Sequence, residues 1–156
     1  MEHVSLSVAL IRKTYNQSLR WLARLNPTSK KLGFVIGERL NMESFRETTI
    51  REVAWELLLD RQRDFLVSNM AQLNLEFVDR MPGHYDKSRV VVSFYNVEVY
   101  RKEVVEALES DRANFWVTSE EICNGVTRDG RRFDPLVPYL INRSSVIQYW
   151  ESSQGN

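Results

Sequence analysis

Residues 37–59 read GERLNMESFRETTIREVAWELLL, and they include most of the clearest helical pattern of the chain. From residue 43 to residue 60 the apolar side chains recur at intervals of three and four, which places them on one face of a helix. The members of this face are Ile50, Val53, Ala54, Leu57 and Leu58. Ser44 is suited to cap the start of the helix, because Glu47 follows it three residues later and completes a capping box. The segment therefore predicts an amphipathic helix over residues 43–60.

Two glutamates lie away from the apolar face of this predicted helix. Glu52 and Glu56 are four residues apart, so one stands about one turn above the other. With Glu52 at the origin of a helical wheel, Glu56 lies at about 40° and the apolar residues between about 100° and 240°. Magnesium binds phosphates together with one or two carboxylates. A metal site is one hypothesis for this pair, and an ordinary solvated helix face is the other.

The segments around the helix alternate in polarity and are rich in β-branched residues, which predicts strands. We expect strands over residues 3–12, 19–25, 67–79, 89–100 and 114–117, and a short apolar run over 32–37. Further helices are expected over 101–110, from residue 119 and over 134–150, with loops over 81–88 and 124–134. The length predicts one domain over residues 1–151, followed by a frayed tail over 152–156.

Composition narrows the classes of protein to which the chain can belong. Lys plus Arg and Asp plus Glu both number 21, so the chain lacks the basic excess typical of non-specific nucleic-acid binding, and we expect no nucleic-acid partner. The single cysteine, Cys123, has no internal disulfide partner, which favours a reducing, cytoplasmic location. No apolar stretch is long enough to span a bilayer, so we expect a soluble protein without a membrane partner.

The spacing of residues within 37–59 resembles the Nudix box. In that motif a Gly is followed after five residues by Glu, after seven more by Arg-Glu, and then by an aliphatic residue, any residue, Glu-Glu, any residue, Gly and an aliphatic residue. The matching positions are Gly37, Glu43, Arg51, Glu52, Val53, Glu56 and Leu59. Three positions depart: Trp55 replaces the first Glu of the pair, Leu58 replaces the Gly, and Ile36 stands where the family often has another Gly. Residues 116–122 also resemble a Trp-x-x-x-Glu-Glu-aliphatic element common near the C-terminus of Nudix proteins.

The resemblance implies a fold and a reaction. The fold is an α/β Nudix-type α/β/α sandwich with a mixed sheet in a single domain, with the box helix on one side of the sheet and the C-terminal helix on the other. The reaction is that of a divergent Nudix hydrolase, the metal-dependent hydrolysis of a phosphoanhydride in a nucleoside diphosphate linked to another moiety. The implied cofactor is Mg²⁺ or Mn²⁺, and the implied partner is a small-molecule nucleotide. Dimers are frequent in the family, so a homodimer is compatible with the resemblance.

The resemblance also implies roles for individual residues. Glu52 and Glu56 correspond to metal ligands, and Glu52 also helps to activate water. Arg51 and Glu43 form a supporting ion pair, although the helix also offers Arg51 a partner in Glu47, four residues before it. Gly37 lets the backbone turn from a strand into the catalytic loop.

Trp55 leaves two functions open, because an indole cannot ligate magnesium. The first is an enzyme in which two glutamates hold a metal that the nucleotide brings, and the second is a catalytically weak or inactive nucleotide-binding or sensing module. Trp55 itself is interpreted as a packing residue beneath a neighbouring segment, or alternatively as a platform for a nucleobase. Arg128 and Arg131 are candidate substrate contacts, although exposed loop charges are usually only solvated. A further catalytic carboxylate, Glu98 or Glu103, cannot be aligned.

Overall fold

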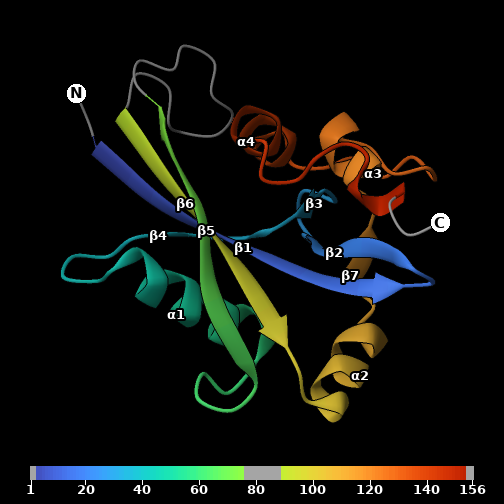
Figure 1. Ribbon diagram of the computed structural model, residues 1–156, viewed down its shortest axis with the longest axis horizontal. Helices are drawn as coiled ribbons and strands as arrows, with labels where there is room; N and C mark the ends of the chain where they lie inside the picture. The colour runs from blue at the N-terminus through green and yellow to red at the C-terminus, as the bar shows by residue number, and fades with distance from the viewer. Residues whose placement is uncertain (1–2, 76–88, 154–156) are drawn as a thin grey trace.

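A mixed β-sheet forms the centre of the computed structural model, which describes residues 3–75 and 89–153 (Figure 1). Its strands in the described residues are β1 (His3–Tyr15), β2 (Ser18–Leu25), β3 (Leu32–Gly33), β4 (Val35–Glu38), β5 (Phe65–Leu75), β6 (Arg89–Val99) and β7 (Asn114–Val117). The order is β3-β2-β1-β6-β5, with β4 paired to β1 and β7 paired to β2. The parallel pairing of β1 with β6 and the antiparallel pairing of β1 with β2 and β4 make the sheet mixed, as predicted.

The long strand β1 organises the sheet, because it has partners along both of its edges. Residues 3–11 pair with β6 along one edge. Along the other edge, residues 6–9 pair with β4 and residues 12–15 pair with β2. The chain therefore leaves β4 opposite Leu6, and the helix that follows begins close by, where the Ser7 hydroxyl donates to the Phe45 carbonyl.

Helices cover both faces of the sheet. They are α1 (Phe45–Leu57), α2 (Lys102–Ser110), α3 (Ser119–Asn124), α4 (Leu136–Ser144) and the 3₁₀ helix η1 (Glu151–Ser153). Figure 1 shows α1 on one side of the sheet and α3 and α4 on the other. Among the helices that the structure describes, none has the length and apolar character that a membrane span requires.

Two hydrophobic cores, one on each face, hold the layers together. Alternate residues of β1 point to opposite faces: Leu6, Val8 and Leu10 join Leu140 and Ile141 of α4 in one core. Ala9 and Ile11 join Val53 and Leu57 of α1 in the other core. The architecture is therefore the predicted α/β/α sandwich, with the helix of residues 43–60 and the C-terminal helix on opposite sides.

Helix α1 begins and ends through local interactions. The Ser44 Oγ accepts a hydrogen bond from the Glu47 N–H at 3.0 Å, and the Glu47 carboxylate accepts one from the Ser44 N–H at 3.2 Å, which confirms the capping box. At the other end Leu58 adopts a left-handed conformation with φ 55°, and its side chain is 88% exposed. The expectation that Leu58 belongs to the apolar face is wrong, because the left-handed turn directs its side chain away from the core.

The C-terminal part of the chain also differs from its predicted bounds. Helix α4 ends at Ser144 rather than near residue 150, because Ser145 adopts a left-handed conformation with φ 57°. The tail over residues 152–156 was expected to be frayed, but its first two residues lie in the 3₁₀ helix η1. The Ser152 side chain donates to the Leu19 carbonyl and accepts from the Ser119 N–H. Residues 154–156, the predicted loop 81–88 and the end of the predicted strand 67–79 lie outside the described residues.

Candidate functional site

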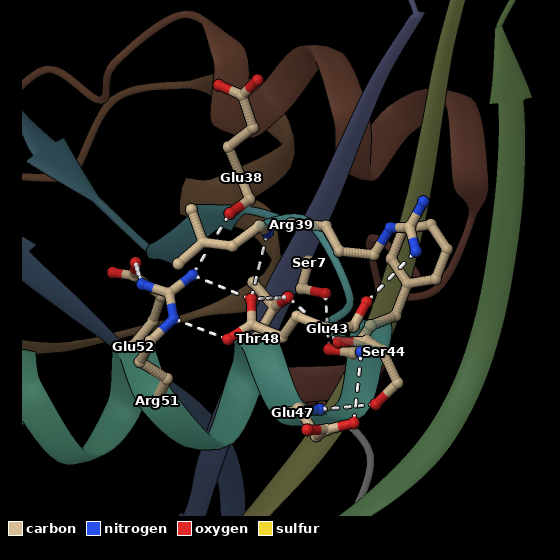
Figure 2. A network of polar contacts seen from close by, with 11 residues as sticks. Ser7, Glu38, Arg39, Glu43, Ser44, Glu47, Thr48, Arg51 and Glu52 are labelled. Atoms are coloured by element: carbon tan, nitrogen blue, oxygen red, sulfur yellow. Dashed lines mark hydrogen bonds and ion pairs between the residues drawn. The ribbon is translucent and has the colours of Figure 1, made fainter.

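Arg51 on α1 holds two glutamates in place (Figure 2). Its guanidinium donates two hydrogen bonds to Glu43, from Nε to Oε2 at 2.8 Å and from Nη2 to Oε1 at 3.0 Å. Nη1 donates to Glu52 Oε1 at 2.6 Å, and Nη2 also donates to the Glu38 carbonyl at 3.2 Å. Of the two partners left open by the sequence, Arg51 takes Glu43, because Glu47 is engaged in capping the helix.

Glu43 is held as a carboxylate. Thr48, whose side chain is buried, donates a hydrogen bond from Oγ1 to Glu43 Oε1 at 2.6 Å, and the Leu40 N–H donates to the same oxygen at 3.2 Å. The hydrogen bonds from Arg51 are the largest cause that lowers the pKa of Glu43 from 4.5 to about 2. The same contacts raise the pKa of Arg51 above its usual range. The pair is therefore charged throughout the physiological pH range.

Gly37 makes room for Glu52. A Cβ atom at position 37 would lie 2.2 Å from the Glu52 Cγ, far inside van der Waals contact. Gly37 lies inside β4 and does not adopt a positive φ, so it does not serve the strand-to-loop turn that the resemblance implies. Its lack of a side chain instead lets Glu52 lie directly against the strand, with its side chain 25% exposed.

Glu56 forms an ion pair with a residue from another part of the chain. Arg24 of β2 donates from Nε to Glu56 Oε1 at 3.3 Å, and from Nη1 to Asp111 Oδ2 at 3.3 Å. Arg24 also donates to the side-chain oxygen of Asn114, its neighbour across the β2–β7 pair. Sequence reasoning missed Arg24, because a polar residue on a half-buried strand carries no local signal of a partner 32 residues away.

A cleft of about 610 Å³ opens beside Glu56. Its lining comes from the end of β2, the loop over residues 26–31, the β3–β4 segment and the loop after α2. Among the charged residues of this lining the positive ones outnumber the negative ones, and they are Arg24, Lys30, Lys31 and Arg112. Clefts of this size are typical of small-molecule sites.

Trp55 does not pack in the interior of the chain. Its side chain is 78% exposed, so the interpretation of Trp55 as a packing residue beneath a neighbouring segment is wrong. The physical reason is its place on α1, because the buried residues Val53 and Leu57 occupy the face that meets the sheet. The alternative interpretation, a platform for a nucleobase, stays a prediction.

The other candidate residues lie elsewhere. Arg128 lines a different cavity with Glu120 and Glu121, and neither it nor Arg131 lines the cleft beside Glu56. Arg131 pairs with Asp129 at 2.8 Å and lies over the ring of Phe115. The structure therefore does not bring these two arginines to that cleft.

The two carboxylates considered as further catalytic groups are also apart from the cleft beside Glu56. Glu98 lines another cavity, and Glu103 pairs with Arg101. In the described residues no group of three or more His, Cys, Asp or Glu side chains could hold a metal ion. The candidate site thus offers two carboxylates, Glu52 and Glu56, one turn apart on α1.

No family model matches the chain, and no curated protein matches it by sequence. Solved structures do match it. An Ap4A hydrolase of Caenorhabditis elegans superposes with a TM-score of 0.60 at 11% identity, over 96% of this chain and 96% of that chain.

Two further solved structures that match are a candidate Nudix hydrolase and a Nudix domain. A candidate Nudix hydrolase of Listeria monocytogenes has a TM-score of 0.55 at 14% identity, over 88% of this chain and 91% of that chain. The Nudix domain of Shewanella oneidensis NrtR, bound to ADP-ribose, has a TM-score of 0.50 at 12% identity, over 92% of this chain and 86% of that chain. Likeness at such identities concerns the backbone alone, and it shows that this chain has the Nudix fold.

Proposed function

We propose that this protein hydrolyses a phosphoanhydride bond of a nucleotide, using Glu52 and Glu56 together with Mg²⁺ or Mn²⁺. The observation that carries the proposal is the position of the Arg51 guanidinium. It joins Glu43, which precedes α1, to Glu52, which lies on α1 together with Glu56. This arrangement orients one glutamate rigidly and leaves the other at the edge of a cationic cleft. The likeness to an Ap4A hydrolase supports the same class of reaction.

The donor set suits a metal that arrives with the nucleotide. Magnesium in phosphate sites commonly takes one or two carboxylates from the protein and its other ligands from phosphates and water. Glu52 and Glu56 would supply those carboxylates, whereas Trp55 contributes no oxygen donor. When bound, such a metal neutralises phosphate charge and lowers the pKa of an attacking water.

The residues of the chain would then orient the attack and receive a proton. Glu52 Oε1 is bonded to Arg51, and Oε2 accepts no hydrogen bond from the part of the chain that the structure describes. We assign to Oε2 the proton released as water oxygen bonds to phosphorus and the anhydride P–O bond breaks. Arg51 keeps the carboxylate at a fixed position during that step, because Glu43 holds the guanidinium from the other side.

A second candidate function, nucleotide binding without efficient turnover, is favoured by two observations. Trp55 stands exposed beside the glutamates and offers an aromatic surface instead of a carboxylate. Arg24 already provides a positive charge to Glu56, which a metal would have to displace. A protein with these features would keep a nucleotide in the cleft but activate water poorly.

A screen of phosphoanhydride substrates tests the proposal. Purified protein is incubated with nucleoside triphosphates, dinucleoside polyphosphates, ADP-ribose and nucleotide sugars, each with Mg²⁺ or Mn²⁺, and phosphate-containing products are measured. We expect turnover that disappears in chelator and in Glu56→Gln but persists in Glu106→Gln, which removes an exposed charge from α2. Absence of turnover together with a nucleotide-dependent rise in melting temperature would instead support the binding function. Absence of both would contradict the two candidates.

A further inference from the structure

Three cations line the cleft beside Glu56 without an ionic partner among residues 3–75 and 89–153. We call Lys30, Lys31 and Arg112 the cation cluster. All three line the cleft, and none of them takes part in an ion pair within the described residues. Positive charges gathered around a concave surface attract and concentrate anions. The cluster is therefore a surface suited to a negatively charged ligand.

Hydrogen bonds fix the backbone that carries the two lysines. The Asn26 side-chain oxygen accepts from the N–H groups of Thr28 and Ser29 at 2.8 and 3.1 Å. The Asn26 backbone pairs with the same short loop, donating to the Lys31 carbonyl at 2.9 Å and accepting from the Lys30 N–H at 2.8 Å. The loop is thus a tight turn rather than a loose connection, and little backbone ordering is needed on binding.

The backbone around Arg112 is fixed in a similar way. The Ala113 N–H donates to the Asp111 carboxylate at 2.9 Å, and the Ala113 carbonyl accepts from the Leu25 N–H at 2.8 Å. The end of β2 therefore lies between the two loops that carry the cation cluster. Both loops present their charges to one cleft from positions set by the sheet.

The charges around the cleft do not cancel. Arg24 is shared by two carboxylates, Glu56 and Asp111. Among the residues that line the cleft, the remaining carboxylate is Asp134, against the three members of the cation cluster. The four cations of the lining therefore outnumber the three carboxylates around it, Glu56, Asp111 and Asp134, and the cation cluster is left available for an anionic ligand.

We propose that the cation cluster binds phosphates beyond the scissile anhydride, so that the preferred ligands are nucleotides with three or more linked phosphates. A nucleoside diphosphate joined to an uncharged sugar would leave the cluster without an anionic partner. The inference rests on the proposed function only in that it places the scissile anhydride beside Glu56. Anion binding by the cluster itself requires neither metal nor turnover.

Calorimetric titration with inorganic tripolyphosphate and pyrophosphate in chelator tests the cluster without hydrolysis. We expect the wild type to bind tripolyphosphate about tenfold more tightly than pyrophosphate, with an affinity that falls as salt is raised. The double variant Lys30→Gln/Lys31→Gln should lose most of that preference, and Lys30→Arg/Lys31→Arg should retain it. Lys102→Gln, which removes an exposed charge from α2, is the matched control.

A second titration compares ATP with ADP-ribose in the presence of Mg²⁺. ATP should bind more tightly to the wild type, and the two ligands should bind about equally to the Lys30→Gln/Lys31→Gln variant. The inference would be overturned if the wild type bound ATP and ADP-ribose with equal affinity. It would also be overturned if Lys102→Gln reduced the preference for ATP as much as Lys30→Gln/Lys31→Gln does. If the wild type showed these binding preferences but no hydrolysis of any nucleotide, the proposed hydrolysis would be contradicted and the cation cluster would still be supported.

Discussion

Single residues of the candidate site have functions that can be separated by substitution. Arg51 binds Glu43 through two hydrogen bonds and Glu52 through a third, so its position decides where both carboxylates lie. Gly37 supplies the space in which Glu52 rests. Leu58 ends the helix in a conformation that glycine adopts without strain.

The pairing of Glu43 with Arg51 predicts a dependence of stability on pH. The pKa of Glu43 is lowered from 4.5 to about 2 in the folded protein, so ionised Glu43 stabilises the fold above pH 4.5. That contribution should be lost as the pH falls through the window between these values. The free-energy difference between wild type and Glu43→Gln should be about 2 kcal/mol at neutral pH and should shrink toward pH 2. Urea unfolding at several pH values measures it, and a constant difference would contradict the assignment.

Gly37→Ala should be destabilising, because the new methyl group would overlap the Glu52 Cγ. We expect a loss of about 1–3 kcal/mol in unfolding free energy, typical of overpacking, and a displaced Glu52 carboxylate. Gly33→Ala is the control, since a Cβ atom there meets nothing within 4 Å. Thermal unfolding of the two variants compares them directly. Equal stability of the two would show that Glu52 does not need this space.

Leu58→Gly should stabilise the protein. Leu58 adopts φ 55°, and its exposed side chain has little packing to lose. Relief of the left-handed strain should raise the unfolding free energy by about 0.5–1 kcal/mol, after allowance for the greater freedom of glycine in the unfolded chain. Leu58→Ala keeps the Cβ atom and should leave stability nearly unchanged. If alanine stabilised as much as glycine, side-chain removal rather than backbone strain would be the cause.

At the scale of elements, helix α1 has the strongest sequence signal in the chain, and it also contains Trp55, whose exposure differs from the interpretation of that residue as a packing residue. The capping box and the helix follow from residue spacing within one short segment. The pairing of Arg51 with Glu43 was instead implied by the resemblance to the Nudix box, since helical spacing by itself offered Glu47 as the partner. The exposure of Trp55 did not follow, because apolar character predicts burial only on average.

Trp55→Glu should increase metal affinity by adding a third carboxylate beside Glu52 and Glu56 on this helix. We expect Mn²⁺ to bind at least about tenfold more tightly to the variant, because ligand charge and number tune the affinity of oxygen sites. Electron paramagnetic resonance of free Mn²⁺ measures the change, and Trp55→Gln controls for loss of the indole alone. Unchanged affinity in Trp55→Glu would mean that position 55 does not face the metal site.

At the scale of the whole molecule, local patterns predicted the elements, and the resemblance of residues 37–59 to the Nudix box implied how they are layered. Alternation in β1 and β6 and helical spacing in α1 predicted these strands and this helix, and the two cores lie on the faces that alternation implies. The contacts of Glu56 were not predictable, since Arg24 meets it only through the order of the strands. The cleft likewise joins the loop over residues 26–31 to the loop after α2, which lie far apart in sequence.

The steady-state rate of nucleotide hydrolysis by Glu52→Gln, measured against wild type with Mg²⁺, tests the central claim most directly. Glutamine preserves the shape of Glu52 and can still accept a hydrogen bond from Arg51, but it can neither hold a cation tightly nor take a proton from water. We expect kcat to fall by about 100-fold or more, as for loss of a general base, while nucleotide binding is largely kept. If Glu52→Gln hydrolysed nucleotides with the same kcat as the wild type, the proposed function of Glu52 would be contradicted.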